Sequence, residues 1–259
     1  RIRSIVEIGG GYGFLMQDFL KRLDGPKVLM VDISPYLLEK QKETLKGYPV
    51  QFRREDFLET DPAIMRDMDL AVLNESLGDF PVVLNMGRDA FNTHHDGADA
   101  CLEEVWGLFE KYALDMPAAE LFHFNIGAIR AVEKLCASGV GYIFLCEHSC
   151  ESEVPGQLKP FVRLAAAGIP EKISLRGHDE YTIKFSYLQK VARFFNYTSV
   201  RGPLADFLEF DFTPGLRFIL ASHAVAKDEY EIIRHFIGDL YKYEYLILMK
   251  SDTGQPPAD

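Results

Sequence analysis

The chain is poor in cysteine and tryptophan, with four and one respectively among 259 residues. Four cysteines are too few for the dense disulfide framework of small secreted proteins, so we expect reduced thiols and a cytoplasmic location. No apolar run reaches the length of a membrane-spanning helix, and the first residues do not form a signal peptide. We therefore expect no membrane partner.

Positive charge is also scarce, because 28 Lys and Arg face 39 Asp and Glu and give a net charge of −11. Proteins that bind nucleic acid mainly through its phosphates need basic surface, so no nucleic-acid partner is expected. The acidic balance does tolerate a cationic substrate. A hydrophobic content of 47% with 26% charged residues is typical of a folded globular protein.

What the chain does contain is a glycine-rich corner within residues 5–15. An apolar run ends in four glycines within five positions, and a helical pattern follows at once. A strand, a glycine turn and a helix N-terminus together form a nucleotide-binding corner. The spacing is Glu7-x-Gly9-x-Gly11-x-Gly13, whereas the dinucleotide fingerprint Gly-x-Gly-x-x-Gly would place its third glycine at Phe14. An ordinary β–α turn is the alternative interpretation.

Alternating strands and helices predict an α/β fold with a Rossmann-like, doubly wound, mostly parallel seven-stranded sheet and a helical insertion. The expected strands are Ser4–Ile8, Lys27–Val31, Val50–Arg53, Asp69–Leu73, Gly141–Cys146, Tyr197–Arg201 and Tyr243–Met249. The expected helices are Gly13–Leu23, Pro35–Gly47, Leu102–Tyr112, Ala118–Ala137, Ile183–Phe195 and Val225–Leu240.

The irregular segments complete the predicted domain organisation. We expect a loop over Val82–Gly97 and a loop with a short helix over Ser149–Gly168. One domain would span residues 1–250, with 82–138 as a mostly helical insertion that caps the substrate, and with a disordered tail over 251–259. Because the sequence starts at Arg1, almost on the first strand, we also expect it to be part of a longer protein.

Polar side chains follow the expected strands at their carboxyl ends, where open α/β sheets bind ligands. Asp32 is placed to accept both hydroxyls of a ribose, with Ile33 beside it. Asp56 and Phe57 are placed to meet an adenine, although Asp56 could instead cap a helix. Glu7 would fix the glycine loop or contact the ammonium of a ligand through water.

Two further stretches support a resemblance. The alternate glycine spacing, with an acid two residues before the first glycine, looks like motif I of the class I S-adenosylmethionine (SAM)-dependent methyltransferases. Residues 28–45 and the loop from Asn74 to Val82, Asn-Glu-Ser-Leu-Gly-Asp-Phe-Pro-Val, resemble the MidA family. Departures occur at Gly10 and Tyr12, where that family usually has Pro and Arg, and after the fifth strand, where it has Asp-Tyr-Gly.

The resemblance implies SAM as cofactor and a protein arginine as methyl acceptor, since the mitochondrial MidA members are protein arginine methyltransferases. The implied cofactor contacts include Asn74. Carboxylates can clamp a guanidinium through paired hydrogen bonds, and Glu75 and Asp79 are the candidates, with Glu147 as a third. His178 is a candidate general base. Capping or purely structural roles are the alternatives for Glu75, Asp79 and His178.

Two other functions remain open at this point. One is methylation of a small molecule, with 82–138 as a lid over an enclosed pocket. The other is a non-catalytic SAM-fold protein that acts as an assembly partner. A homodimer is a candidate assembly. No metal site is expected, because Cys146-x-His148-x-Cys150 lacks a second ligand pair nearby and His94-His95-Asp96 is more typical of a solvated loop.

Overall fold

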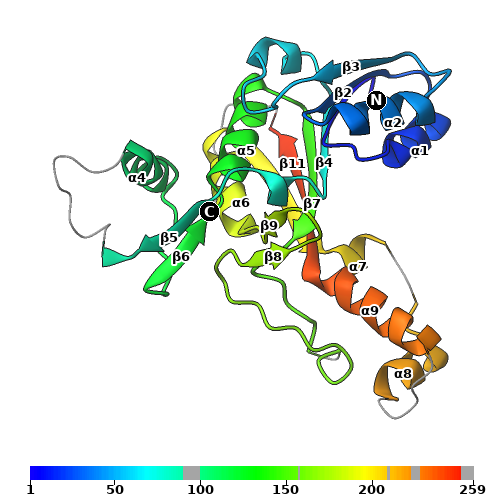
Figure 1. Ribbon diagram of the computed structural model, residues 1–259, viewed down its shortest axis with the longest axis vertical. Helices are drawn as coiled ribbons and strands as arrows, with labels where there is room; N and C mark the ends of the chain where they lie inside the picture. The colour runs from blue at the N-terminus through cyan, green and yellow to red at the C-terminus, as the bar shows by residue number, and fades with distance from the viewer. Residues whose placement is uncertain (90–99, 157, 209–210, 223–227, 252–259) are drawn as a thin grey trace.

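A seven-stranded sheet forms the centre of the molecule (Figure 1). The computed structural model describes residues 1–89, 100–156, 158–208, 211–222 and 228–251. The strand order is β10-β11-β7-β4-β1-β2-β3, and β11 runs antiparallel to both of its neighbours while the other pairs are parallel. The Rossmann-like fold prediction is therefore confirmed. The strands are β1 (Ser4–Ile8), β2 (Lys27–Asp32), β3 (Val50–Arg54), β4 (Leu70–Asn74), β7 (Tyr142–His148), β10 (Tyr197–Pro203) and β11 (Tyr243–Lys250).

The inner parallel strands β1, β2 and β4 are apolar on both faces, because helices cover both sides of the sheet. On one face, Ile5 and Met30 pack with α1 (Phe14–Arg22) and the region of α2 (Pro35–Thr44). On the other, neighbouring residues such as Val6 and Val31 belong to a larger core with α5 (Ile126–Ser138) and α6 (Phe185–Phe194). Successive residues of β1 and β2 thus alternate between the two cores.

The two helices that follow β1 and β2 begin where the sequence predicts. Gly13 precedes α1 in the left-handed region, with φ of 80°, and a Cβ there would lie 3.4 Å from Cα of Gln41 in α2. Ser34 caps α2 as expected, since its Oγ accepts a hydrogen bond from the Leu37 N–H at 3.3 Å and Pro35 occupies the first turn. Both helix N-termini therefore lie beside the glycine loop.

The middle of the chain departs from the prediction. β5 (Val83–Gly87) pairs antiparallel with β6 (Leu121–Phe124), so the predicted loop is wrong over β5, and the predicted helix from Ala118 is wrong up to Asn125. Residues 90–97 of that loop lie outside the described residues. The physical reason is a period of two in β6, where Phe122 and Phe124 are buried and Leu121 is exposed. The described part of the segment predicted as an insertion, 82–138, therefore contains a two-stranded ribbon besides α4 (Ala100–Tyr112) and α5.

A short hairpin that the sequence did not predict packs beside β6 and the turn after β4. β8 (Lys172–Ser174) pairs antiparallel with β9 (Asp179–Tyr181), and β9 packs on the 3₁₀ turn η2 (Leu77–Asp79) that follows β4. The Tyr181 ring meets the His123 ring of β6 edge-on at 5.5 Å. The hairpin therefore brings the segment between β8 and β9 to the carboxyl end of β4.

A small lobe extends from the end of the sheet (Figure 1). It comprises α7 (Leu204–Phe207), α8 (Pro214–Ala221) and α9 (Asp228–Lys242), which share an apolar cluster with residues 154–162. The short helix predicted within Ser149–Gly168 is absent from the described residues of that segment. The first residues of the predicted helix Val225–Leu240, 225–227, lie outside the described residues. So do residues 252–259 of the predicted disordered tail. No described helix combines the length and apolarity that crossing a membrane requires.

Candidate functional site

A pocket of ≈ 490 Å³ lies at the carboxyl ends of β1 to β4. This volume is in the range of sites that bind small molecules. The residues that line it are Ile8, Gly9, Gly11, Val31, Asp32, Ile33, Ser34, Leu37, Glu55, Asp56, Phe57, Glu75, Ser76, Asp79, Phe80, Pro81 and His178. Most of the residues predicted for cofactor binding and catalysis therefore meet in one place.

The glycine loop forms the floor of this pocket. Gly9 has φ of +66°, and a Cβ built there would lie 2.7 Å from Cβ of Ser76. Gly11 has φ of +53° and open space around its Cα. Only glycine combines these backbone angles with such a close approach at no steric cost. The loop thus leaves bare backbone facing the pocket, as a bound nucleotide-like cofactor requires.

Asp32 is buried at the pocket wall, with its carboxylate already oriented by the protein. Its Oδ1 accepts the Ser34 N–H at 2.9 Å, and its Oδ2 accepts Nε2 of the buried Gln41 at 2.8 Å. The same Gln41 amide donates to the Gly11 carbonyl at 3.1 Å. Gln41 therefore connects the glycine loop to Asp32, and each carboxylate oxygen retains lone-pair capacity for a ligand hydroxyl.

The turn after β3 supplies the opposite wall. Asp56 accepts the Leu58 N–H at 2.9 Å, so it does make a local turn contact while it also lines the pocket. Phe57 is buried, and its ring stacks with Phe80 at 6.4 Å between centroids. The ammonium of Lys134, from α5, donates to the carbonyls of Phe57 and Thr60 at 3.1 and 2.7 Å. This turn is therefore fixed from behind.

The turn after β4 carries the acidic end of the pocket. Glu75 has φ of +51°, an uncommon angle for a residue with a Cβ. Its Oε2 accepts the Tyr243 hydroxyl at 3.1 Å. Asn74, by contrast, is not among the residues that line the pocket, and its amide lies 3.4 Å from Oε1 of Glu75.

A histidine lies between two carboxylates at the rim. Nε2 of His178 lies 3.1 Å from Oε1 of Glu180 and 3.4 Å from Oδ1 of Asp79. The hydrogen bond to Glu180 raises the pKa of His178, and the charges of Glu180 and Asp79 add to the rise. Burial raises the pKa of Asp79, with Glu180 adding to the rise and His178 opposing it. His178 and Asp79 are each about half exposed, so this end is open to an acceptor.

Glu147 does not reach the pocket surface. It is 3% exposed, and its two oxygens accept backbone N–H groups of Gly78, at 3.2 Å, and of His148, at 3.0 Å. Burial raises the pKa of Glu147 to about 7, although these two hydrogen bonds oppose the rise. Its position shows that it supports the turn bearing Asp79, and its predicted role as a third clamp receives no support.

Glu7 lies beneath the glycine loop. It is 2% exposed, and its Oε2 has no hydrogen-bond partner in the described structure. Burial raises the pKa of Glu7 to about 8, and the nearby Asp32 carboxylate adds to the rise. Neither Glu7 nor Gly13 lines the pocket, so Gly13 serves the start of α1 and its packing on α2. The unpartnered Glu7 oxygen is the observation that fits a cationic ligand above the loop.

The rim group also has the chemistry of a cation site. Asp79, His178 and Glu180 each offer one ligand atom, and these atoms lie within 4.8 Å of one another. The sequence did not predict this set, because only the β8–β9 hairpin brings Glu180 to Asp79. The paired His94 and His95 lie outside the described residues. Cys146 and Cys150 are buried, and burial raises the pKa of both thiols to about 12.

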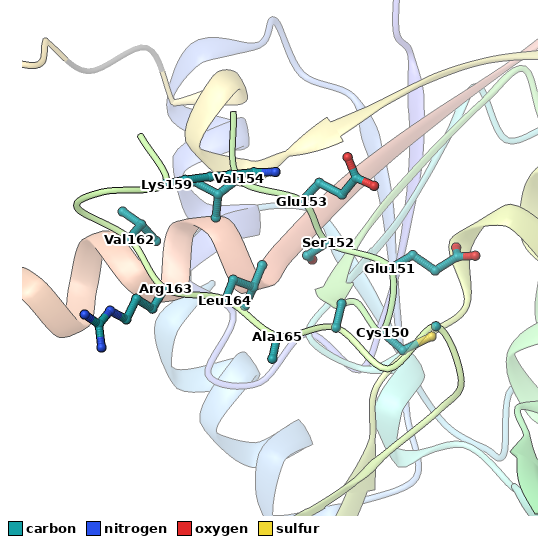
Figure 2. A pocket seen from close by; sticks show the side chains of 12 residues that line it. Cys150, Glu151, Ser152, Glu153, Val154, Lys159, Val162, Arg163, Leu164 and Ala165 are labelled. Carbon is teal, nitrogen blue, oxygen red and sulfur yellow. The ribbon is translucent and has the colours of Figure 1, made fainter. Parts of the chain in front are cut away.

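A second hollow, of ≈ 840 Å³, lies within the segment from Cys150 to Gly168 (Figure 2). Glu151 lines it, but its carboxylate is already held by Lys184 at 2.9 Å and by Arg201 at 3.1 Å. Every lining residue comes from this one segment. The hollow is therefore separate from the strand ends, and we place the functional site in the smaller pocket.

A comparison with known protein families matches the part of the chain that forms the pocket. Residues 2–105 match the model of a family described as "Putative S-adenosyl-L-methionine-dependent methyltransferase". This segment carries β1 to β4 and every pocket-lining residue except His178. The cofactor of this chain is therefore SAM, as predicted.

Individual relatives are more distant. Over 48 residues the chain is 44% identical to 2-methyl-6-phytyl-1,4-hydroquinone methyltransferase 2, chloroplastic, of Oryza sativa subsp. japonica, which is 18% of this chain and 14% of that protein. A protein from Listeria monocytogenes, described as a "putative S-adenosylmethionine dependent methyltransferase", has a similar structure, with a TM-score of 0.51 and 11% identity. The match covers 97% of this chain and 91% of that one.

A third similar structure is an O-methyltransferase family protein from Burkholderia thailandensis, with a TM-score of 0.48 and 13% identity. The match covers 98% of this chain but 52% of that protein, so the chain spans about half its length. The likeness to the Listeria structure, together with the order of the seven strands, establishes the class I methyltransferase fold. Neither they nor the family match identifies the MidA subfamily.

Proposed function

We propose that this chain is a SAM-dependent methyltransferase whose acceptor is a basic protein side chain, with arginine as the leading candidate. The observation that carries the proposal is the acidic acceptor end of the cofactor pocket. Glu75 and Asp79 lie there, and none of the residues lining the pocket is Lys or Arg. Such a surface favours a cation and offers carboxylates that can pair with a guanidinium.

The residues present fit SAM. Gly9 and Gly11 expose backbone, Asp32 offers oriented carboxylate oxygens, and Glu7 offers an unpartnered buried oxygen. When bound, SAM supplies an electrophilic methyl group on a positively charged sulfur. Acidic surroundings stabilise that charge, whereas they would oppose the pyrophosphate of a dinucleotide.

The acceptor would be positioned by the carboxylates of the β4 turn. Glu75 and Asp79 would hold two edges of the guanidinium, so that the reacting nitrogen faces the methyl group. Methylation of a guanidinium releases one proton. The raised pKa of Asp79 makes it the better proton acceptor, because the raised pKa of His178 favours its protonated form near neutral pH. Most of the acceleration would come from orientation and charge.

The resemblance of residues 28–45 and 74–82 to the MidA family supports arginine in particular. Tritium-labelled SAM should place label in the protein fraction of a lysate, and acid hydrolysis should recover it on methylarginine. Label in small molecules alone would overturn the protein acceptor. Absence of SAM binding by calorimetry would overturn the enzyme assignment altogether.

Glu75→Gln should separate acceptor chemistry from cofactor binding. The substitution keeps the size of the side chain but removes the charge that holds a guanidinium. Turnover should fall about 100-fold, while the Kd for SAM changes less than about twofold, since the cofactor contacts are elsewhere. Calorimetry and the label assay measure the two quantities on the same preparation. Turnover that equals the wild-type value would remove Glu75 from the mechanism.

Methylation of a small hydroxyl compound is the second candidate, and one observation favours it. Nε2 of His178 lies within 3.4 Å of carboxylate oxygens of Asp79 and Glu180, and these carboxylates orient the imidazole so that its deprotonated form can act as a general base toward a hydroxyl. The apolar walls at Phe57, Phe80 and Pro81 suit a ring. Label in an organic extract of the same assay would establish this candidate.

A further inference from the structure

Tyr243 is the first residue of β11 and is far from the pocket in sequence. It pairs in register with His148 of β7. The carbonyl of the preceding Lys242 accepts the Ser149 N–H at 2.9 Å and the Ser152 hydroxyl at 2.8 Å. The backbone that carries Tyr243 is therefore held to β7 and to the segment that follows β7.

The side chain of Tyr243 makes two contacts that fix its direction. Its ring lies against the His148 ring, with 3.9 Å between centroids and an angle of 35° between the planes. Its hydroxyl donates to Oε2 of Glu75 at 3.1 Å. Burial and the charges of Glu75 and Glu147 raise the pKa of Tyr243 above its ordinary value, so the phenol is a hydrogen-bond donor at neutral pH.

Glu75 needs such a contact. It lies directly after β4 with a left-handed backbone, and its side chain is exposed. Its carboxylate also contacts the Asn74 amide, at the long distance of 3.4 Å. A glutamate on an open rim has several rotamers of similar energy. One fixed hydrogen bond from a rigid donor selects a single arrangement before the acceptor arrives.

We propose that Tyr243 is a positioning residue that holds Glu75 in the orientation needed to bind the methyl acceptor. The inference rests on the proposed function for its catalytic consequence. The phenol donates to Oε2, while Oε1, whose contact with the Asn74 amide is long at 3.4 Å, retains lone-pair capacity to accept from a cationic substrate. Tyr243 itself need not touch the acceptor.

Tyr243→Phe tests this role, because it removes the hydroxyl and keeps the ring on His148. With the lysate protein fraction as acceptor, turnover should fall about tenfold, and the Kd for SAM should stay within about twofold of the wild-type value. In a Glu75→Gln background, Tyr243→Phe should cause no further loss of turnover. An equal loss in both backgrounds would overturn the proposal, because a merely structural role acts independently of Glu75.

Tyr245→Phe is the matched control. It removes a phenolic hydroxyl two residues along the same strand, where the ring packs on Phe207 rather than near Glu75, so turnover should not change. Urea unfolding gives a measurement that does not depend on activity. It compares four proteins: the wild type, Tyr243→Phe, Glu75→Gln and the variant with both substitutions. The two substitutions should be non-additive in the unfolding free energy, and strict additivity would overturn the contact. If the wild type transfers no methyl group, the proposed function fails while this unfolding cycle still decides whether Tyr243 holds Glu75.

Discussion

Glu7 should make SAM binding depend on pH. With a pKa of about 8, its carboxyl is largely protonated in the free protein at neutral pH. A cation bound above the loop favours the ionised form, so binding should release a proton. The affinity for SAM should therefore rise by up to about tenfold per pH unit as the pH rises from about 6 to about 7.5. Calorimetry in buffers of different ionisation enthalpy measures both the affinity and the proton release.

Glu7→Gln is the control for this effect, since its amide does not titrate. The pH dependence of SAM affinity should flatten in the variant, and a persisting slope would place the titrating group elsewhere. The same group affects stability with a defined sign. Its folded pKa is raised from 4.5, so its contribution to the unfolding free energy is complete below pH 4.5 and is lost as the pH rises to about 8. Glu7→Gln should remove that loss.

Single residues also show what the sequence could and could not predict. Asp32 ends an apolar strand and the glycines follow another, while Asp56 comes two residues after the edge strand β3, so their place in a pocket follows from strand topology alone. Glu180 contacts His178 and Tyr243 contacts Glu75, but neither position follows from the order of the strands. The β8–β9 hairpin places Glu180, and the register of β11 with β7 places Tyr243. The sequence analysis therefore missed both. It also could not separate Glu147, which turned out to be buried against backbone N–H groups, from the exposed acids.

At the scale of elements, the glycine loop offers a paired test. Gly9→Ala and Gly11→Ala both force a Cβ into the left-handed region, which costs each about 1–2 kcal/mol. Only the Cβ at Gly9 meets a close neighbour, at 2.7 Å from Cβ of Ser76, whereas Gly11 has open space. Gly9→Ala should therefore lower the unfolding free energy by about 1–3 kcal/mol more than Gly11→Ala.

SAM affinity should instead fall more in Gly11→Ala than in Gly9→Ala. The added methyl group of Gly11→Ala lies at the wall of the pocket, so this variant should fold almost normally and bind SAM at least tenfold more weakly. Urea unfolding and calorimetry on both variants give the comparison. Equal losses of stability would mean that the corner accommodates Gly9→Ala by a shift of Ser76.

Elements buried on both faces were predicted with nearly correct bounds, because a continuous apolar run ending in glycine or acid has few alternative structures. The β5–β6 ribbon and the β8–β9 hairpin were not. Leu121 to Phe124 is a short, mostly apolar stretch, and no strong stop signal separates it from the helix that follows. The sequence pattern therefore predicts one continuous helix from Ala118. Lys172–Ser174 and Asp179–Tyr181 are three-residue strands with mostly polar side chains, which become strands through pairing with each other.

At the scale of the whole molecule, charge should guide the acceptor. The chain has a net charge of −11, and the open rim of the pocket is acidic. Association of an arginine-containing peptide should therefore weaken several-fold as the NaCl concentration rises from about 50 to about 500 mM, through screening. A peptide with citrulline in place of arginine serves as the neutral control, and its weak binding should not respond to salt. Salt-independent turnover of the arginine peptide would argue for a neutral acceptor instead.

The left-handed corner at Glu75 has a consequence over evolutionary time. A residue with a Cβ is strained there, and glycine is not, so glutamate at this position has an energetic penalty that a use for its carboxylate would explain. In a descendant that no longer transfers methyl groups, replacement by glycine would increase stability and should spread by drift or selection. The residue at this position would then distinguish active methyltransferases from proteins of the same fold that have lost the activity.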